Sequence, residues 1–169
     1  MVLILMGVSG SGKTTVGTRL ADALEWDFVD GDAFHPEANV QKMERGEPLT
    51  DADRWPWLRA IRDFIHEQLS EGTPTIVACS ALKAAYREVL LDDNPGAQIV
   101  YLKGSYDLIR RRLEARTDHF FDLELLDSQF EALEEPVAEA ALTVHVDASP
   151  EAIVRTIRRE LPALLASSE

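Results

Sequence analysis

The sequence predicts an α/β fold in which a parallel β-sheet is flanked by helices. Short β-branched runs alternate with longer segments of helical apolar spacing, and three of the runs are almost continuously apolar, as in strands covered on both faces. The chain has 169 residues, 46% of them hydrophobic and 28% charged, with no internal repeat or linker. We therefore expect one domain over residues 1–169.

The strands that we expect are bounded by turn or helix signals: Val2–Met6, Asp27–Asp30, Thr75–Cys79, Gln98–Leu102 and Leu142–Val146. The first, third and fourth are the continuously apolar ones. Cys79 fits a small core residue at the end of the third strand. Because it is the one cysteine of the chain, no intramolecular disulfide forms and we expect a cytoplasmic protein.

Two segments have apolar residues at helical spacing, one after the first expected strand and one before the third. The two stripes that we expect to pack on the sheet are Val16, Leu20, Ala23 and Leu24, and Leu58, Ile61, Ile65 and Leu69.

Capping signals predict where two helices begin. Asp53 as N-cap places Pro56 in the first turn, where its missing N–H costs little, whereas a start at Thr50 would place Pro56 deeper and kink the helix. Ser149 followed by Pro150 predicts the start of the last helix.

Charge and hydropathy exclude two classes of partner. Thirty acidic against seventeen basic residues give a formal charge of −13, which repels nucleic acid at long range. The apolar runs are strand-sized, far short of the ~20 residues of a membrane helix. Arg110–Arg112 and Arg116 form a local cationic stretch that fits a small anionic ligand.

A phosphate-binding motif carries the first functional prediction. Residues 7–14 fit G-x-x-x-x-G-K-[ST] between the first expected strand and a helix, the context in which backbone N–H groups cradle phosphates. An incidental glycine-rich turn is the alternative. Lys13 would reach the β- and γ-phosphates of ATP, and Thr14 would bind Mg²⁺. The expected nucleotide contacts are Gly7, Ser9, Gly10, Ser11, Gly12, Lys13, Thr14 and Thr15.

Two carboxylates follow the second expected strand, in Asp30-Gly31-Asp32. Carboxyl ends of strands line the ligand crevice of a parallel sheet, so one carboxylate, assigned to Asp30, can hold Mg²⁺ through water. The other, Asp32, can orient a substrate hydroxyl. A polar turn is the alternative.

Further polar side chains fall just after strand ends or on the helices that leave them: His35, Arg54, Ser80, Lys83, Tyr86 and Arg87. Each has a structural explanation alone, such as pairing of Arg54 with Asp51. Their shared position favours a substrate pocket.

Three segments resemble the small P-loop gluconate kinases: DGDAFHPEANVQKMERGEPLTDADRWPWL, CSALKAAYREVLL and ARTDHFFDLELLDSQFEALEEP. The resemblance implies ATP-dependent phosphorylation of D-gluconate to gluconate 6-phosphate, with Mg²⁺ brought by ATP. It also implies a P-loop NTPase fold like that of nucleoside-monophosphate kinases, with a five-stranded parallel sheet, a mobile lid at about residues 113–128, and a homodimer.

The resemblance also assigns residues to roles. It implies Asp32 at the reacting hydroxyl, and His35, Arg54 and Arg87 at the polyol and carboxylate. Arginine forks suit a planar carboxylate. Ser80, Lys83 and His119 complete the expected substrate site. In the lid, Arg112 would contact the nucleotide and Arg116 the transferring phosphoryl group.

Two alternatives stay open at this point. One is a kinase for another small anionic polyol such as shikimate, although the segment from His35 to Leu58 resembles the gluconate family specifically. The other is a nucleotide-dependent regulatory protein that keeps the P-loop without turnover.

Overall fold

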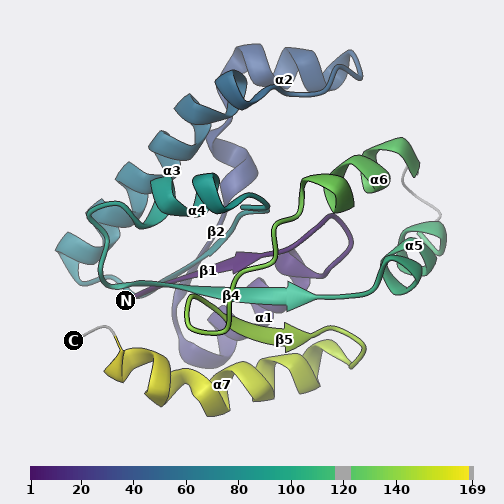
Figure 1. The fold of residues 1–169 in the computed structure, drawn as a ribbon. Coiled ribbons are helices and arrows are strands. Elements are labelled where there is room, and N and C mark those ends of the chain that lie inside the picture. Colours follow the sequence, from purple (N-terminus) through teal and green to yellow (C-terminus); the bar gives the residue numbers. More distant parts are fainter. Residues whose placement is uncertain (117–122, 168–169) are drawn as a thin grey trace.

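The computed structural model describes residues 1–116 and 123–167, which form a sheet between two layers of helices (Figure 1). Five parallel strands lie in the order β2-β3-β1-β4-β5. Their bounds are β1 Val2–Met6, β2 Asp27–Asp30, β3 Thr75–Ala78, β4 Ala97–Lys103 and β5 Leu142–His145. The predicted parallel sheet is therefore confirmed, with differences of one residue at four strand ends.

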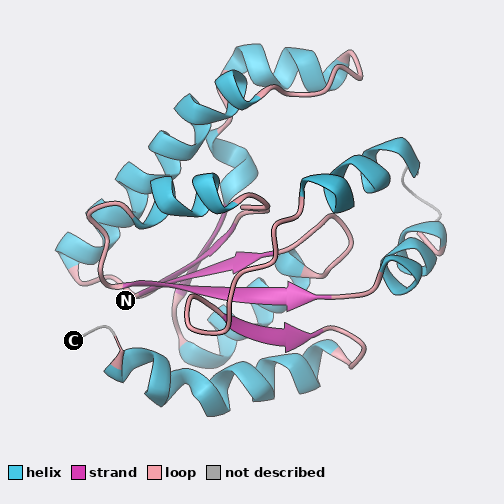
Figure 2. Ribbon diagram, in the orientation of Figure 1, coloured by secondary structure: helices cyan, strands magenta, loops and turns pink. Residues whose placement is uncertain are grey.

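The helices alternate with the strands along the chain (Figure 2). Their bounds are α1 Lys13–Leu24, the 3₁₀ turn η1 Gly31–Phe34, α2 Glu37–Glu44, α3 Asp51–Glu71, α4 Ala84–Leu91, α5 Tyr106–Glu114, α6 Leu123–Ala132 and α7 Pro150–Ala166. Of the helices described, none is both long and apolar enough to cross a bilayer.

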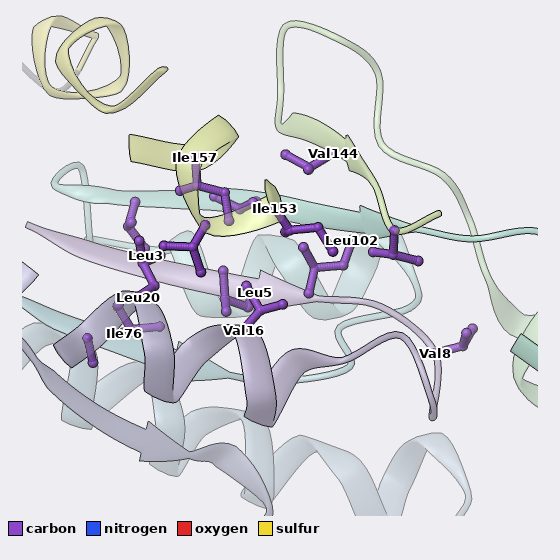
Figure 3. Packing of buried hydrophobic residues seen from close by; sticks show 14 of the residues in the cluster. Leu3, Leu5, Val8, Val16, Leu20, Ile76, Leu102, Val144, Ile153 and Ile157 are labelled. Atoms are coloured by element: carbon purple, nitrogen blue, oxygen red, sulfur yellow. The ribbon is translucent and has the colours of Figure 1, made fainter. Parts of the chain in front are cut away.

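The core lies on both faces of the central strand β1, whose five residues are fully buried. Alternate side chains point to opposite faces of a strand. Leu3 and Leu5 pack with α1 and α7, where Figure 3 shows Val16 and Ile157 among the neighbours. The other face packs against α3 and α4. Burial on both faces explains the continuously apolar sequence of β1.

The apolar stripe of α1 differs from the predicted one at three positions. Val16 and Leu20 are buried as expected, but Gly17 and Ala21 join them while Ala23 is exposed. A Cβ on Gly17 would lie 2.4 Å from the Phe28 ring, so glycine lets α1 approach the sheet closely.

The predicted start of α3 at Asp53 is wrong, because Thr50 is the N-cap. The Thr50 hydroxyl accepts from the Asp53 N–H at 3.2 Å, and the Asp53 carboxylate accepts from the Thr50 N–H at 2.9 Å. This reciprocal capping box satisfies two backbone donors. It stabilises a start that leaves Pro56 inside the helix. For α7 the prediction is confirmed: Ser149 caps it and Pro150 is its first residue.

Candidate active site

The phosphate-binding loop leaves the carboxyl end of β1 and enters α1. Gly10 and Gly12 have φ of 83° and 96°, a left-handed conformation that glycine adopts without strain. Gly12 is the N-cap of α1, and no side chain in the described part of the chain caps this helix. The N–H groups of its first turn are thus left for a ligand with negative charge.

Lys13 lies folded into the loop. Its Nζ donates to the carbonyl oxygens of Gly7 and Val8, at 2.8 and 3.2 Å. Burial lowers the pKa of Lys13, while the nearby carboxylates of Asp32 and Asp30 oppose that shift. The loop therefore holds an ammonium group in a poorly solvated place, where attraction to a phosphate is strong.

The loop is also tied to α6 by a contact that the sequence did not predict. The Ser9 N–H donates to Gln129 Oε1 at 2.6 Å, and Gln129 Nε2 donates to the Ser9 hydroxyl at 3.0 Å. The two residues are 120 positions apart. A glutamine on a helix carries no local signal for such a partner.

The turn after β2 is fixed from three sides. The Asp30 carboxylate accepts from the Asp32 N–H at 2.9 Å, and Trp57 Nε1 donates to the Gly31 carbonyl at 2.8 Å. A Cβ on Gly31 would lie 2.6 Å from the Ala78 carbonyl oxygen. Asp32 itself is free to meet a ligand, since 82% of its side chain is exposed.

His35 lies behind Asp32. Its ring stacks on Trp57 with centroids 4.2 Å apart, and its Nε2 lies 4.0 Å from Asp32 Oδ1. Burial lowers the pKa of His35, which the Asp32 carboxylate opposes. The imidazole is therefore neutral near pH 7. The other ring nitrogen, Nδ1, lies 3.2 Å from Asn39 Nδ2.

Arg54 and Lys83, both predicted as substrate contacts, meet around one carboxylate. Lys83 Nζ lies 3.2 Å and Arg54 Nη1 3.8 Å from Asp51 Oδ1, and the Tyr86 hydroxyl donates to the same oxygen. Arg54 also donates to that hydroxyl at 3.2 Å. The Tyr86 and Lys83 hydrogen bonds lower the pKa of Asp51. This group has one net positive charge at neutral pH.

Arg87 is placed differently from the expectation. The residue is 7% exposed, and its guanidinium donates to the carbonyls of Ala81, Leu82 and Glu134 at 2.8, 3.1 and 2.7 Å. It thereby holds the loop before α4, where Ala81 has φ of 46°. The structure gives Arg87 a role in the fold and does not bring it into the group around Asp51.

Three of the remaining predicted residues, Ser80, Arg112 and Arg116, follow the carboxyl ends of β3 and β4. The Ser80 carbonyl accepts from the Gly7 N–H at 3.3 Å, joining the end of β3 to the phosphate loop. Arg112 donates to the Val146 carbonyl, and Arg116 is exposed just after α5. His119 and the part of the expected lid at 117–122 lie outside the described residues.

Cys79 is a buried thiol, and the acidic and histidine side chains of the described residues form no metal-binding cluster. Burial raises the pKa of the Cys79 thiol to about 12, so it is a protonated core side chain as predicted. Within residues 1–116 and 123–167, no group of three or more His, Cys, Asp or Glu residues could hold a metal ion by itself.

Comparison with known proteins identifies the family. A family model described as an AAA domain matches residues 2–136. The thermoresistant gluconokinase of Escherichia coli (strain K12) is 44% identical over 155 residues, which are 90% of this chain and 89% of that protein. The gluconokinase of Gluconobacter oxydans (strain 621H) is 45% identical over 163 residues, 94% of this chain and 92% of that protein.

Solved structures agree with this result. A gluconokinase from Sinorhizobium meliloti 1021 superposes with a TM-score of 0.82 at 43% identity, over 99% of this chain and 90% of that one. Shikimate kinase from Aquifex aeolicus vf5 gives a TM-score of 0.69 at 20% identity, over 96% of this chain and 97% of that one, and shares the fold. With such identity over almost its whole length, the chain belongs to the gluconokinase family.

Proposed function

We propose that this chain transfers the γ-phosphoryl group of ATP to D-gluconate, giving gluconate 6-phosphate. The observation that carries the proposal is the proximity of Lys13, which follows β1, to Asp30 and Asp32 at the end of β2. Their carboxylates oppose the lowering of the lysine pKa by burial. A phosphate-binding cation and a carboxylate for an acceptor hydroxyl thus share one edge of the sheet. The names of the relatives supply the identity of the acceptor.

The reaction places ATP in the phosphate loop and the terminal hydroxyl of gluconate against Asp32. The carboxylate orients this hydroxyl and takes its proton as the oxygen attacks the γ-phosphorus in line. Lys13 stabilises the charge on the phosphoryl oxygens. Arg116 is proposed to approach the same group from the lid, with Arg112 at the nucleotide and His119 at the substrate.

The carboxylate of gluconate is proposed to bind Arg54 and Lys83. Among the residues that the structure describes, these cations pair with one carboxylate, that of Asp51, so their positive charge is only partly compensated. His35 and Ser80 would contact the hydroxyls. A contribution from Arg87 to the substrate carboxylate stays a prediction, because its guanidinium holds three backbone carbonyls.

Mg²⁺ is proposed to arrive with ATP. The Thr14 hydroxyl and the Asp30 carboxylate are hard oxygen donors, which suit Mg²⁺, and so small a donor set fits an ion that keeps phosphate and water ligands. When bound, the ion would neutralise phosphate charge. We also propose a homodimer in the cytoplasm, following the family resemblance; light scattering tests the dimer.

The test is ADP release with Mg·ATP and D-gluconate, shikimate, other aldonates or no acceptor. Release with D-gluconate alone is expected. Release with shikimate would move the assignment to another kinase, and turnover independent of any acceptor would overturn the proposal.

Two variants then test the role of Asp32. Asp32→Asn should lower turnover by about 10²- to 10⁴-fold while ATP binding persists. Asp27→Asn, at an exposed aspartate of β2, is the matched control and should not change turnover. An unchanged rate in Asp32→Asn would remove this residue from the mechanism.

A further inference from the structure

We propose that Asn39 is a positioning residue that keeps the proton of the neutral His35 imidazole on Nε2, the nitrogen facing Asp32. The role of this proton in turnover rests on the proposed function, whereas its location does not. Asn39 stands on α2, four residues after His35, and no sequence motif singled it out.

The orientation of the Asn39 amide follows from a second partner. Its Nδ2 donates to the Asp53 backbone carbonyl at 2.9 Å. A carbonyl oxygen only accepts hydrogen bonds, so the atom facing it is the amide nitrogen. The same Nδ2 lies 3.2 Å from His35 Nδ1 and directs its second hydrogen there. His35 Nδ1 must therefore accept, which leaves the ring proton on Nε2.

Packing around the His35 imidazole holds the ring in the orientation that faces Asn39. Asn39 is 3% exposed and the His35 side chain 5% exposed. The imidazole stacks on Trp57 with an interplanar angle of 14°. α2 and the start of α3 lie side by side beyond the sheet (Figure 1), which brings Asn39 against Asp53. The buried amide therefore acts on a ring whose plane is already fixed.

Asn39 also opposes protonation of His35. An imidazolium would present an N–H from Nδ1 to an NH₂ group that can only donate. Among the described residues, the charged groups that act on His35 are Asp32, which favours the cation, and Arg54, which disfavours it. Burial, the largest effect on the His35 pKa, also disfavours the cation.

The Nε2–H proton suits a hydroxyl substrate. Nε2 and the Asp32 carboxylate oxygen are 4.0 Å apart, so a hydroxyl oxygen beside them can lie about 2.8 Å from both. That hydroxyl would accept from Nε2–H and donate to Asp32. With the proton on Nδ1, both neighbours would be acceptors and one bond would be lost. Asn39 thus sets a donor and an acceptor at the place where a hydroxyl must react.

Nitrogen-15 NMR of the histidine side chains of the ligand-free protein tests the inference without any substrate, with His35→Gln to assign the signal. We expect Nε2–H in the unmodified chain. In Asn39→Asp the carboxylate accepts from Nδ1–H, so the His35 pKa should rise by about one unit or more. The pH profile of turnover should shift with it, and kcat at pH 7 should fall about tenfold or more, with a smaller change in KM for ATP.

Two further variants separate this effect from general destabilisation. Asn39→Leu loses the same amide hydrogen bonds without supplying an acceptor, and because burial still disfavours the cation, it should raise the His35 pKa less than Asn39→Asp does. Asn94→Asp alters another buried asparagine, whose amide donates to Arg62 and Leu90, and should not affect His35. A proton on Nδ1 in the unmodified chain, or an unchanged His35 pKa in folded Asn39→Asp, would overturn the inference. An Nε2–H signal in a chain without acceptor-dependent turnover would overturn only the proposed function.

Discussion

Replacing Arg87 by methionine removes a buried cation that holds three backbone carbonyls, two of them on the buried residues Ala81 and Leu82. A hydrogen bond from a charged group contributes about 1.5–3 kcal/mol, so the gross loss is about 4.5–9 kcal/mol. Removing the guanidinium also removes its desolvation cost, and water can reach the carbonyl of the exposed Glu134. We expect a net loss of about 3–5 kcal/mol in the free energy of unfolding, a large part of the ~5–15 kcal/mol of a typical domain.

Urea unfolding followed by circular dichroism measures this loss. With a slope near 2 kcal/mol per molar, the midpoint should fall by about 1.5–2.5 M. Arg110→Met is the matched control, because Arg110 is an exposed arginine whose one described carboxylate partner is Glu114 four residues on, and it should change stability by less than about 0.5 kcal/mol. An unchanged stability in Arg87→Met together with a large rise in KM for gluconate would refute the structural role and make Arg87 a substrate ligand.

Three shorter predictions concern the acceptor side. Arg54→Ala should raise KM for gluconate about 10- to 100-fold with little effect on KM for ATP. Arg59→Ala, at an exposed position of α3, should change neither KM. Equal rises in the two KM values for Arg54→Ala would move Arg54 out of the acceptor site. Hydrogen bonds from Lys42 and the Thr50 N–H lower the pKa of Asp53 from 3.8 to about 2, so its contribution to stability is complete above pH ~4 and is lost as the pH falls toward 2. Between pH 5 and pH 3, the free energy of unfolding measured with urea should fall less in Asp53→Asn than in the unmodified chain. Gly31→Ala forces a Cβ to 2.6 Å from a backbone oxygen, and an overpacking cost of about 1–3 kcal/mol should lower Tm by roughly 3–10 °C; an unchanged Tm would show that the turn can shift.

The sheet and the phosphate loop could be predicted because their signals are local. A strand covered on both faces needs a continuous apolar run, and β1 has one. The glycine spacing of residues 7–14 specifies the loop directly. The predicted start of α3 was wrong although part of its signal is local, because Thr50 and Asp53, three residues apart, form a capping box that outweighs the cost of Pro56. The partner that Asp53 gains from Lys42 in α2 is seen only in the folded chain.

Side-chain partners far apart in sequence could not be predicted. Arg87 donates across 47 positions to Glu134, and Gln129 pairs with Ser9 across 120. Residue type alone suggests an arginine near a strand end as an anion ligand. Only the folded chain shows whether carbonyls already occupy its donors.

The contacts of Asn39 have a consequence for local opening of the chain. It is the one buried residue of α2, which otherwise presents exposed or half-buried side chains to water. With so little apolar burial, α2 belongs to the low-stability end of the molecule, and its amides should exchange hydrogen well before those of β1. Each such opening would release His35, a residue of the proposed acceptor site, from Asn39, so we expect α2, as one wall of that site, to open separately from the sheet. A molecule bound against that wall would slow the exchange of α2 and leave the sheet unchanged.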